Sequence, residues 1–295
     1  MTEILLLSIA VLLRIFSNPV GNVVQKQLTS SDHHPLIVNF LTYLLLSICC
    51  IVVIPFIRPG HLSNDFWLYS ILGAVVGALG NGFLVRALQK GDLSVLGPIN
   101  AYKSVVGMFV GIFLLSEIPN LWGVFGIVLI IYGSYFVLDA TEERFTLKLL
   151  KNKEIQFRLW AMVLTAIEAV FIKKIILASS TTIAFVSWCC FGAIFSFLLL
   201  FIYRLNVSRE LKRIRLSDSA SYLVLIVCIG TMQFTTNYTF DHMPVSYALS
   251  LFQLSTIVSV LLGHRIFKEM EIRKKLIGSF IMLVGSVMII LLKNS

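Results

Sequence analysis

Residues 117–138, EIPNLWGVFGIVLIIYGSYFVL, and residues 269–290, EMEIRKKLIGSFIMLVGSVMII, carry the pattern that decides the fold. Each stretch starts with a glutamate, continues after eight residues with a glycine, and reaches a Gly-Ser pair after six more. The matching pairs share one offset of 152 residues and no gap: Glu117 with Glu269, Gly126 with Gly278, Gly133 with Gly285 and Ser134 with Ser286. The chain therefore reads as a duplicated unit.

Both stretches belong to a series of apolar blocks that runs along the whole chain. A block of about twenty residues crosses a hydrocarbon core of ~30 Å at a helical rise of ~1.5 Å per residue. The blocks are continuously apolar and lack the alternation of barrel strands, so we predict an all-α polytopic membrane protein rather than a β-barrel. The ten predicted spans are 4–26, 36–57, 65–87, 93–115, 121–138, 158–177, 182–204, 219–240, 245–267 and 275–292.

Composition supports the same fold class. Of 295 residues 58% are apolar and 13% are charged, about half the usual charged fraction. The net charge of +9 lies mostly in the loops, as in membrane proteins, so we expect no nucleic-acid partner. The five cysteines lie in apolar blocks and read as small hydrophobes. We expect no metal site, no cofactor and, because no catalytic set of side chains is apparent, no enzymatic activity.

The duplication predicts three parts: a five-helix repeat over 1–138, a connecting loop over 139–157, and a second five-helix repeat over 158–295. Because five is odd, the second repeat must enter the membrane from the opposite side. Two inverted repeats around a central cavity are the architecture from which many secondary transporters obtain alternating access.

The repeated Glu-Gly-Gly pattern, together with ALQKGDLSVLGPINAYKS at residues 87–104, resembles the drug/metabolite transporter superfamily, in particular its ten-span EamA-type members. The resemblance covers the whole chain. It implies a basket of helices in a bacterial inner membrane. It also implies a central cavity that spans 1, 3 and 4 line together with their counterparts 6, 8 and 9.

The loop charges bear on orientation. The loops after odd-numbered spans carry 18 Lys and Arg residues, whereas the other loops and the tail carry four. By the positive-inside rule the odd loops are cytoplasmic and both termini lie outside. The resemblance favours the opposite arrangement, with cytoplasmic termini, and the sequence leaves the choice open.

Three charged residues lie near the middle of the blocks: Arg14, Lys103 and Glu168. Each would cost at least ~2.5–3.5 kcal/mol if isolated in the membrane, and such residues are usually functional. Pairing Glu168 with one base leaves a cation, which we expect to bind the carboxylate or other anionic group of a small substrate. The alternative is a structural Arg14–Glu168 or Lys103–Glu168 bridge without substrate contact. Glu168 is also the candidate for coupling to a proton.

Polar side chains recur at helical spacing in the spans that should line the cavity. They serve either as substrate contacts or as interhelical hydrogen-bonding groups. The further substrate-binding candidates are Asn18, Asn81, Asn100, Tyr102, Gln233, Asn237, Tyr247, Ser250 and Gln253. Pro19 and Pro98 are candidates for gating, because proline loosens a helix. Glu117 and Glu269 are expected to cap the helices that follow them.

We expect a secondary transporter for a small polar, zwitterionic or anionic, amino-acid-like metabolite, with export favoured. The alternative is a flippase for a lipid-linked or amphipathic anionic substrate. The expected partners are therefore the substrate and membrane lipid. The sequence does not decide between monomer and dimer.

Overall fold

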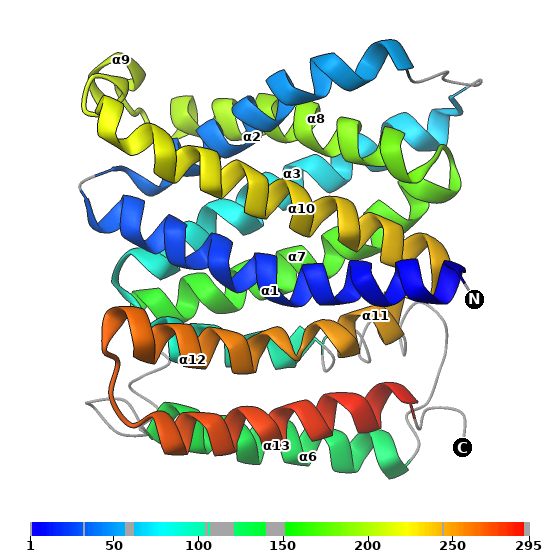
Figure 1. Ribbon diagram of the computed structural model, residues 1–295, viewed down its shortest axis with the longest axis vertical. Helices are drawn as coiled ribbons and strands as arrows, with labels where there is room; N and C mark the ends of the chain where they lie inside the picture. Colours follow the sequence, from blue (N-terminus) through cyan, green and yellow to red (C-terminus); the bar gives the residue numbers. More distant parts are fainter. Residues whose placement is uncertain are drawn as a thin grey trace.

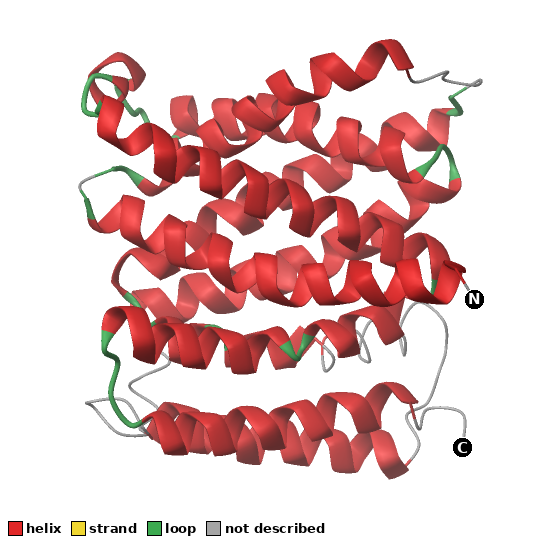
Figure 2. Cartoon of the chain, viewed as in Figure 1, coloured by secondary structure: helices red, strands yellow, loops and turns green. Residues whose placement is uncertain are grey.

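The computed structural model describes residues 2–31, 33–56, 62–103, 106, 121–139, 151–243 and 245–291. Within these residues the chain is helical and contains no strand. Long helices lie side by side in one bundle (Figures 1 and 2).

The elements are long helices and a smaller number of short helical segments. Those of the first part are α1 (Thr2–Ser30), α2 (Pro35–Val53), η1 (Ile54–Phe56), α3 (Asn64–Lys90), α4 (Leu93–Leu96), η2 (Pro98–Ala101) and α6 (Leu121–Asp139). Those of the second part are α7 (Lys153–Leu177), α8 (Thr181–Ile202), α9 (Val207–Leu211), η4 (Leu216–Asp218), α10 (Ser219–His242), α11 (Val245–Phe252), α12 (Ser255–Phe267) and α13 (Ile272–Leu291).

Local sequence sets several helix ends. The Ser63 side chain accepts a hydrogen bond from the Phe66 N–H and caps α3, and Ser180 caps α8 through the Ile183 N–H. Such caps satisfy backbone donors that have no partner inside the helix. Helix α4 ends at Leu96 because Pro98 has no N–H with which to continue the ladder.

Nine predicted spans coincide with described helices, and 93–115 does so only through its first residues. Two boundaries differ in a way that affects the site. Span 245–267 is divided into α11 and α12, and α7 begins at Lys153, five residues before the predicted start. Among the described residues, five stretches are long and apolar enough to cross a membrane: Glu3–Ser30, Pro35–Val52, Asn64–Lys90, Thr181–Ile202 and Leu216–His242.

Two antiparallel helix pairs form the centre of the bundle. In the first pair Gly77 of α3 lies against Glu168 of α7, and a Cβ on Gly80 would lie 3.0 Å from the Thr165 side chain. In the second pair Arg14 of α1 is hydrogen-bonded to Thr236 of α10. Because glycine has no side chain, the two backbones can approach closely at these positions, as is common where helices associate in lipid.

The first helices of the two halves run in opposite directions. Because α1 and α10 are antiparallel, α1 begins beside the end of α10. The Lys173 ammonium near the end of α7 donates to the Phe240 carbonyl near the end of α10. Helix α1 therefore begins at the end of the bundle where α7 finishes.

The glycines of the repeated pattern pack α6 against α13. A Cβ on Gly133 would lie 2.7 Å from the Gly278 carbonyl oxygen, and one on Gly285 would lie 2.6 Å from the Gly126 carbonyl oxygen. Each repeat thus supplies two glycines to one antiparallel contact, seen along the lower edge of Figure 1. The glycines of the pattern that indicated duplication therefore also allow α6 and α13 to pack closely.

The start of α1 and the end of α13 lie at the same end of the bundle in Figure 1. At the other end the α1–α2 and α8–α10 connections meet, where His33 Nε2 lies 3.2 Å from a carboxylate oxygen of Asp218. The α3–α4 and α12–α13 connections meet at that end too, through Lys26 and Glu269. We call it the basic-loop end, because these connections follow odd-numbered spans.

Candidate functional site

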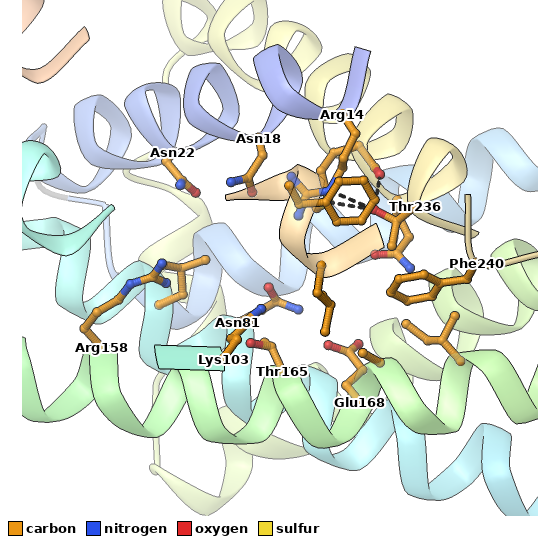
Figure 3. A pocket seen from close by; sticks show the side chains of 17 residues that line it. Arg14, Asn18, Asn22, Asn81, Lys103, Arg158, Thr165, Glu168, Thr236 and Phe240 are labelled. Atoms are coloured by element: carbon orange, nitrogen blue, oxygen red, sulfur yellow. Dashed lines mark hydrogen bonds between the residues drawn. The ribbon is translucent and has the colours of Figure 1, made fainter. Parts of the chain in front are cut away.

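A central cavity of about 80 Å³ lies between the helices (Figure 3). Its walls come from α1, α3, α7, α10 and α11 and from Lys103, the second residue after η2. These are the six segments that the family resemblance implied. The lining residues are Arg14, Asn18, Asn22, Asn81, Leu84, Lys103, Arg158, Thr165, Glu168, Ala169, Ile172, Met232, Gln233, Thr236, Phe240, Leu249 and Phe252.

Arg14 enters the cavity from α1. Its Nε donates to Thr236 Oγ1 at 2.7 Å, and its guanidinium carbon lies 4.8 Å from the centre of the Phe252 ring. Its Nη1 is buried and has no hydrogen-bond partner. Buried donors without a partner are rare in folded proteins, so this nitrogen is available to a ligand.

Glu168 enters from α7 on the opposite side of the cavity (Figure 3). Its Oε1 accepts a hydrogen bond from Trp188 Nε1 at 2.7 Å. Its carboxylate occupies the space that a side chain at Gly77 would fill. Within the described residues no ion pair joins Glu168 to Arg14 or Lys103, so neither structural bridge considered from the sequence is formed.

Arg158 is a third cation of the cavity, and the sequence analysis missed it. The predicted span began at residue 158, which placed this arginine among the loop charges. Because α7 begins at Lys153, Arg158 lies inside the helix, is 4% exposed and donates from Nε to the Leu96 carbonyl at 2.7 Å. Its spacing from Thr165 and Ile172, seven residues each time, could have revealed the shared face.

The cavity walls therefore carry three cations and one carboxylate. Lys103 makes no hydrogen bond or ion pair among the described residues, and Figure 3 shows the Arg158 guanidinium directed toward the cavity. Charges of one sign in a low-dielectric interior are costly unless water or an opposite charge meets them. The arrangement can hold an anion.

Amide side chains extend the polar surface toward the basic-loop end. A second, smaller cavity of about 30 Å³ shares Asn18, Asn22 and Asn81 with the first. Asn81 Nδ2 donates to Tyr43 Oη at 2.7 Å. The oxygens Asn22 Oδ1 and Gln25 Oε1 are buried without a partner. Asn22 was not among the predicted residues, although it lies four residues after Asn18 on the same face.

The other predicted residues are distributed as follows. Gln233 lines the cavity and is hydrogen-bonded to Asn237, which is fully buried outside the lining. Gln253 is buried at the break between α11 and α12, and Tyr102 packs against an apolar cluster, both outside the lining. The side chains of Asn100, Tyr247 and Ser250 lie outside the described part of the structure.

The gating candidates differ in their surroundings. Helix α1 continues through Pro19 without interruption. Pro98 begins η2, so the chain changes there from an α-helix to a 3-10 helix. The preceding Gly97 approaches α12 closely, since its Cβ would lie 2.6 Å from Ser259 Cβ. A gating role for either proline stays a prediction.

Glu269 caps a helix, but not the one that follows it. Its Oε1 accepts from the Leu93 N–H and its Oε2 from the Ser94 N–H, each at 2.8 Å, so it caps α4 from the α12–α13 connection. The expected cap on the following helix was wrong because the tertiary fold brings α4 closer. Glu117 lies outside the described residues.

Lysines complete a cluster that we call the Glu269 clamp: Lys26, residues 91–94, Glu269 and Lys275. Lys26 Nζ lies 3.0 Å from Glu269 Oε1 and donates to the Gly91 carbonyl at 2.8 Å. Lys275 Nζ lies 3.6 Å from a carboxylate oxygen of Asp92. The clamp ties the α3–α4 connection to α1 and to the α12–α13 connection.

The clamp also sets the protonation of its carboxyl group. Burial raises the pKa of Glu269, but the Ser94 hydrogen bonds and the Lys26 charge outweigh burial and hold that pKa below its ordinary value. The carboxylate is therefore ionised at neutral pH.

Long apolar helices around a charged central cavity define a polytopic membrane protein. A sequence model of the EamA-like transporter family matches residues 5–139 and again residues 152–291. The chain therefore belongs to the EamA-like transporter family. It is a multi-pass integral membrane protein of the drug/metabolite transporter type.

Two further comparisons concern relatives and fold. No curated protein matches the chain in sequence. A solved structure described only as "Crystal structure of protein" superposes with a TM-score of 0.68 at 14% identity, over 97% of this chain and 98% of that chain. At this identity the likeness concerns the fold alone.

Proposed function

We propose that this chain is a secondary transporter that moves a small anionic or zwitterionic, amino-acid-like metabolite across the bacterial cytoplasmic membrane. The observation that carries the proposal is the cavity with three cations and one carboxylate. Anionic groups of the substrate bind Arg14 and Lys103, and an ammonium group, where present, faces Glu168. Amides of Asn18, Asn81 and Gln233 supply neutral hydrogen bonds.

Transport proceeds by alternating access, with export as its direction. Antiparallel α1 and α7 support an inverted relation between 1–138 and 158–295. The pairs α1–α10 and α3–α7 support it as well, because exchanging the two halves converts one pair into the other. The Glu269 clamp closes the basic-loop end, and it must open for the cavity to reach that side. Glu168 carries the coupling proton.

The test is transport by the purified protein in liposomes loaded with a metabolite extract, read by mass spectrometry. The variants are Arg14→Gln and Lys103→Gln, and the control is Arg213→Gln. Arg213 is half-exposed and pairs with Glu210 at 3.1 Å, away from the cavity.

We expect each cavity variant to lose at least ~10-fold of the transport rate, because a contact worth ~1.4 kcal/mol corresponds to a factor of ten. The control retains the rate. Unchanged transport in both cavity variants contradicts the proposal. Movement of lipid-linked compounds alone would instead support the flippase.

A further inference from the structure

The central cavity has two ends of different chemistry. Arg158 and Glu168 are ten residues apart on α7, which corresponds to ~15 Å along a helix axis. Figure 3 places Arg158 toward one end of the cavity and Glu168 toward the other, with Lys103 and Thr165 between them. The site is therefore elongated along α7.

The Glu168 end is nearly balanced in charge. Arg14 reaches this end from α1 and Glu168 from α7, and the rings of Phe240 and Phe252 wall it. One cation and one carboxylate at this end match the carboxylate and ammonium of an amino acid, or a single carboxylate on Arg14.

The Arg158 end carries the excess positive charge. Among the described lining residues Arg158 and Lys103 are its cations, and its other polar groups are the neutral amides of Asn18, Asn22 and Asn81. The three cations of the lining exceed its one carboxylate by two charges, so a substrate with a single anionic group leaves one cation without a counter-charge in a buried site, which is costly.

Arg158 is also held in place for binding. Its Nε donates to the Leu96 carbonyl at the end of α4, while the guanidinium points into the cavity. A planar guanidinium fixed through one nitrogen presents its remaining donors in the fork that matches a carboxylate. Fixing the group beforehand lowers the entropy cost of binding.

We propose, resting on the transporter function above, that the substrate is a small elongated diacid, a dicarboxylate or an acidic amino acid. One carboxylate binds Arg14, and the other binds Arg158 and Lys103. Arg158 is then the residue that selects diacids over monoacids.

The experiment measures equilibrium binding to purified protein by titration calorimetry. Glutarate is compared with valerate, and glutamate with glutamine, because each pair differs in one carboxylate at nearly equal size. Succinate and adipate vary the distance between carboxylates. Each probe is titrated into the wild type, Arg158→Gln and the exposed-loop control Arg213→Gln.

We expect at least one diacid of the series to bind the wild type about tenfold more tightly than its monoacid. Arg158→Gln weakens diacid binding more than monoacid binding and so removes that preference, whereas Arg213→Gln keeps it. If the wild type binds every diacid and its monoacid equally, or binds no diacid, the inference is overturned without any variant. A preference that survives in Arg158→Gln also overturns the assignment to Arg158.

Arg158→Lys is the control for a folding defect, since it retains a cation and should keep part of the preference.

Liposome transport distinguishes the diacid inference from the transporter proposal. Transport of monoanionic or neutral amino acids without any diacid preference sinks the diacid inference and leaves the transporter intact. Absence of transport for every compound sinks the transporter proposal itself.

Discussion

The Glu269 clamp and the central cavity both place charged groups inside the helical bundle, but they differ in how fully those groups are paired. In the clamp, Glu269 accepts hydrogen bonds from Lys26, Leu93 and Ser94. In the cavity, Glu168 accepts one hydrogen bond from a protein side chain, and Lys103 makes no hydrogen bond or ion pair among the described residues. Because the charged groups of the clamp are paired with one another, the clamp connects segments of the protein. The charged groups of the cavity are less fully paired, so they can bind a mobile ion.

The largest effect is expected from Glu269→Gln, which removes the charge that neutralises buried Lys26. Breaking a buried pair by removing one partner costs about 3–5 kcal/mol. Thermal unfolding of the purified protein measures the loss. Glu271→Gln is the matched control, because Glu271 is 55% exposed and lies 3.9 Å from Lys274, and such pairs contribute about 0–1 kcal/mol. Equal loss in both variants would show that the clamp adds no stability.

A smaller loss of stability is expected from Gly263→Ala. The added Cβ would lie 2.5 Å from Glu269 Oε2 and 3.0 Å from the Ser94 nitrogen, so the capping carboxylate must move. Overpacking of this kind costs about 1–3 kcal/mol. Gly230→Ala provides the comparison, because its Cβ would meet only the end of the Leu46 side chain at 3.0 Å. Stability of Gly263→Ala equal to that of Gly230→Ala would contradict the close packing.

The smallest expected effect is a change in stability with pH that occurs only at acidic pH. A carboxyl whose folded pKa lies below its unfolded value, ~4.3, contributes stability above that value and loses it as the pH falls through the folded pKa. The stability difference between wild type and Glu269→Gln should therefore be constant between about pH 5 and pH 8 and shrink below about pH 4. Unfolding curves across this range measure it. A difference that changes near pH 7 would contradict the lowered pKa of Glu269.

The sequence predicted the helices and part of the site because both depend on local pattern. Apolar blocks located nine helices within a few residues, and depth within a block identified Arg14, Lys103 and Glu168. Arg158 was missed because hydropathy alone begins a span after its charged first turns, whereas helix α7 starts earlier.

Contacts between distant segments could not be predicted. Trp188 donates to Glu168 across two helices, and Glu269 caps a helix 175 residues away in the sequence. The repeated glycines were recognised as a pattern, but their contact between α6 and α13 depends on the antiparallel packing of the two halves. Such contacts follow from the fold and not from spacing along the chain.

The most direct test of the central claim compares Lys103→Met with Lys26→Met by thermal unfolding of ligand-free protein. The same substitution removes a lysine from the cavity in one variant and from the clamp in the other. We predict that Lys103→Met is at least as stable as the wild type, because it lowers the excess positive charge of the buried cavity, and that Lys26→Met is clearly less stable. Equal destabilisation of both variants would contradict the account, because it would mean that the cavity lysine is already paired within the protein.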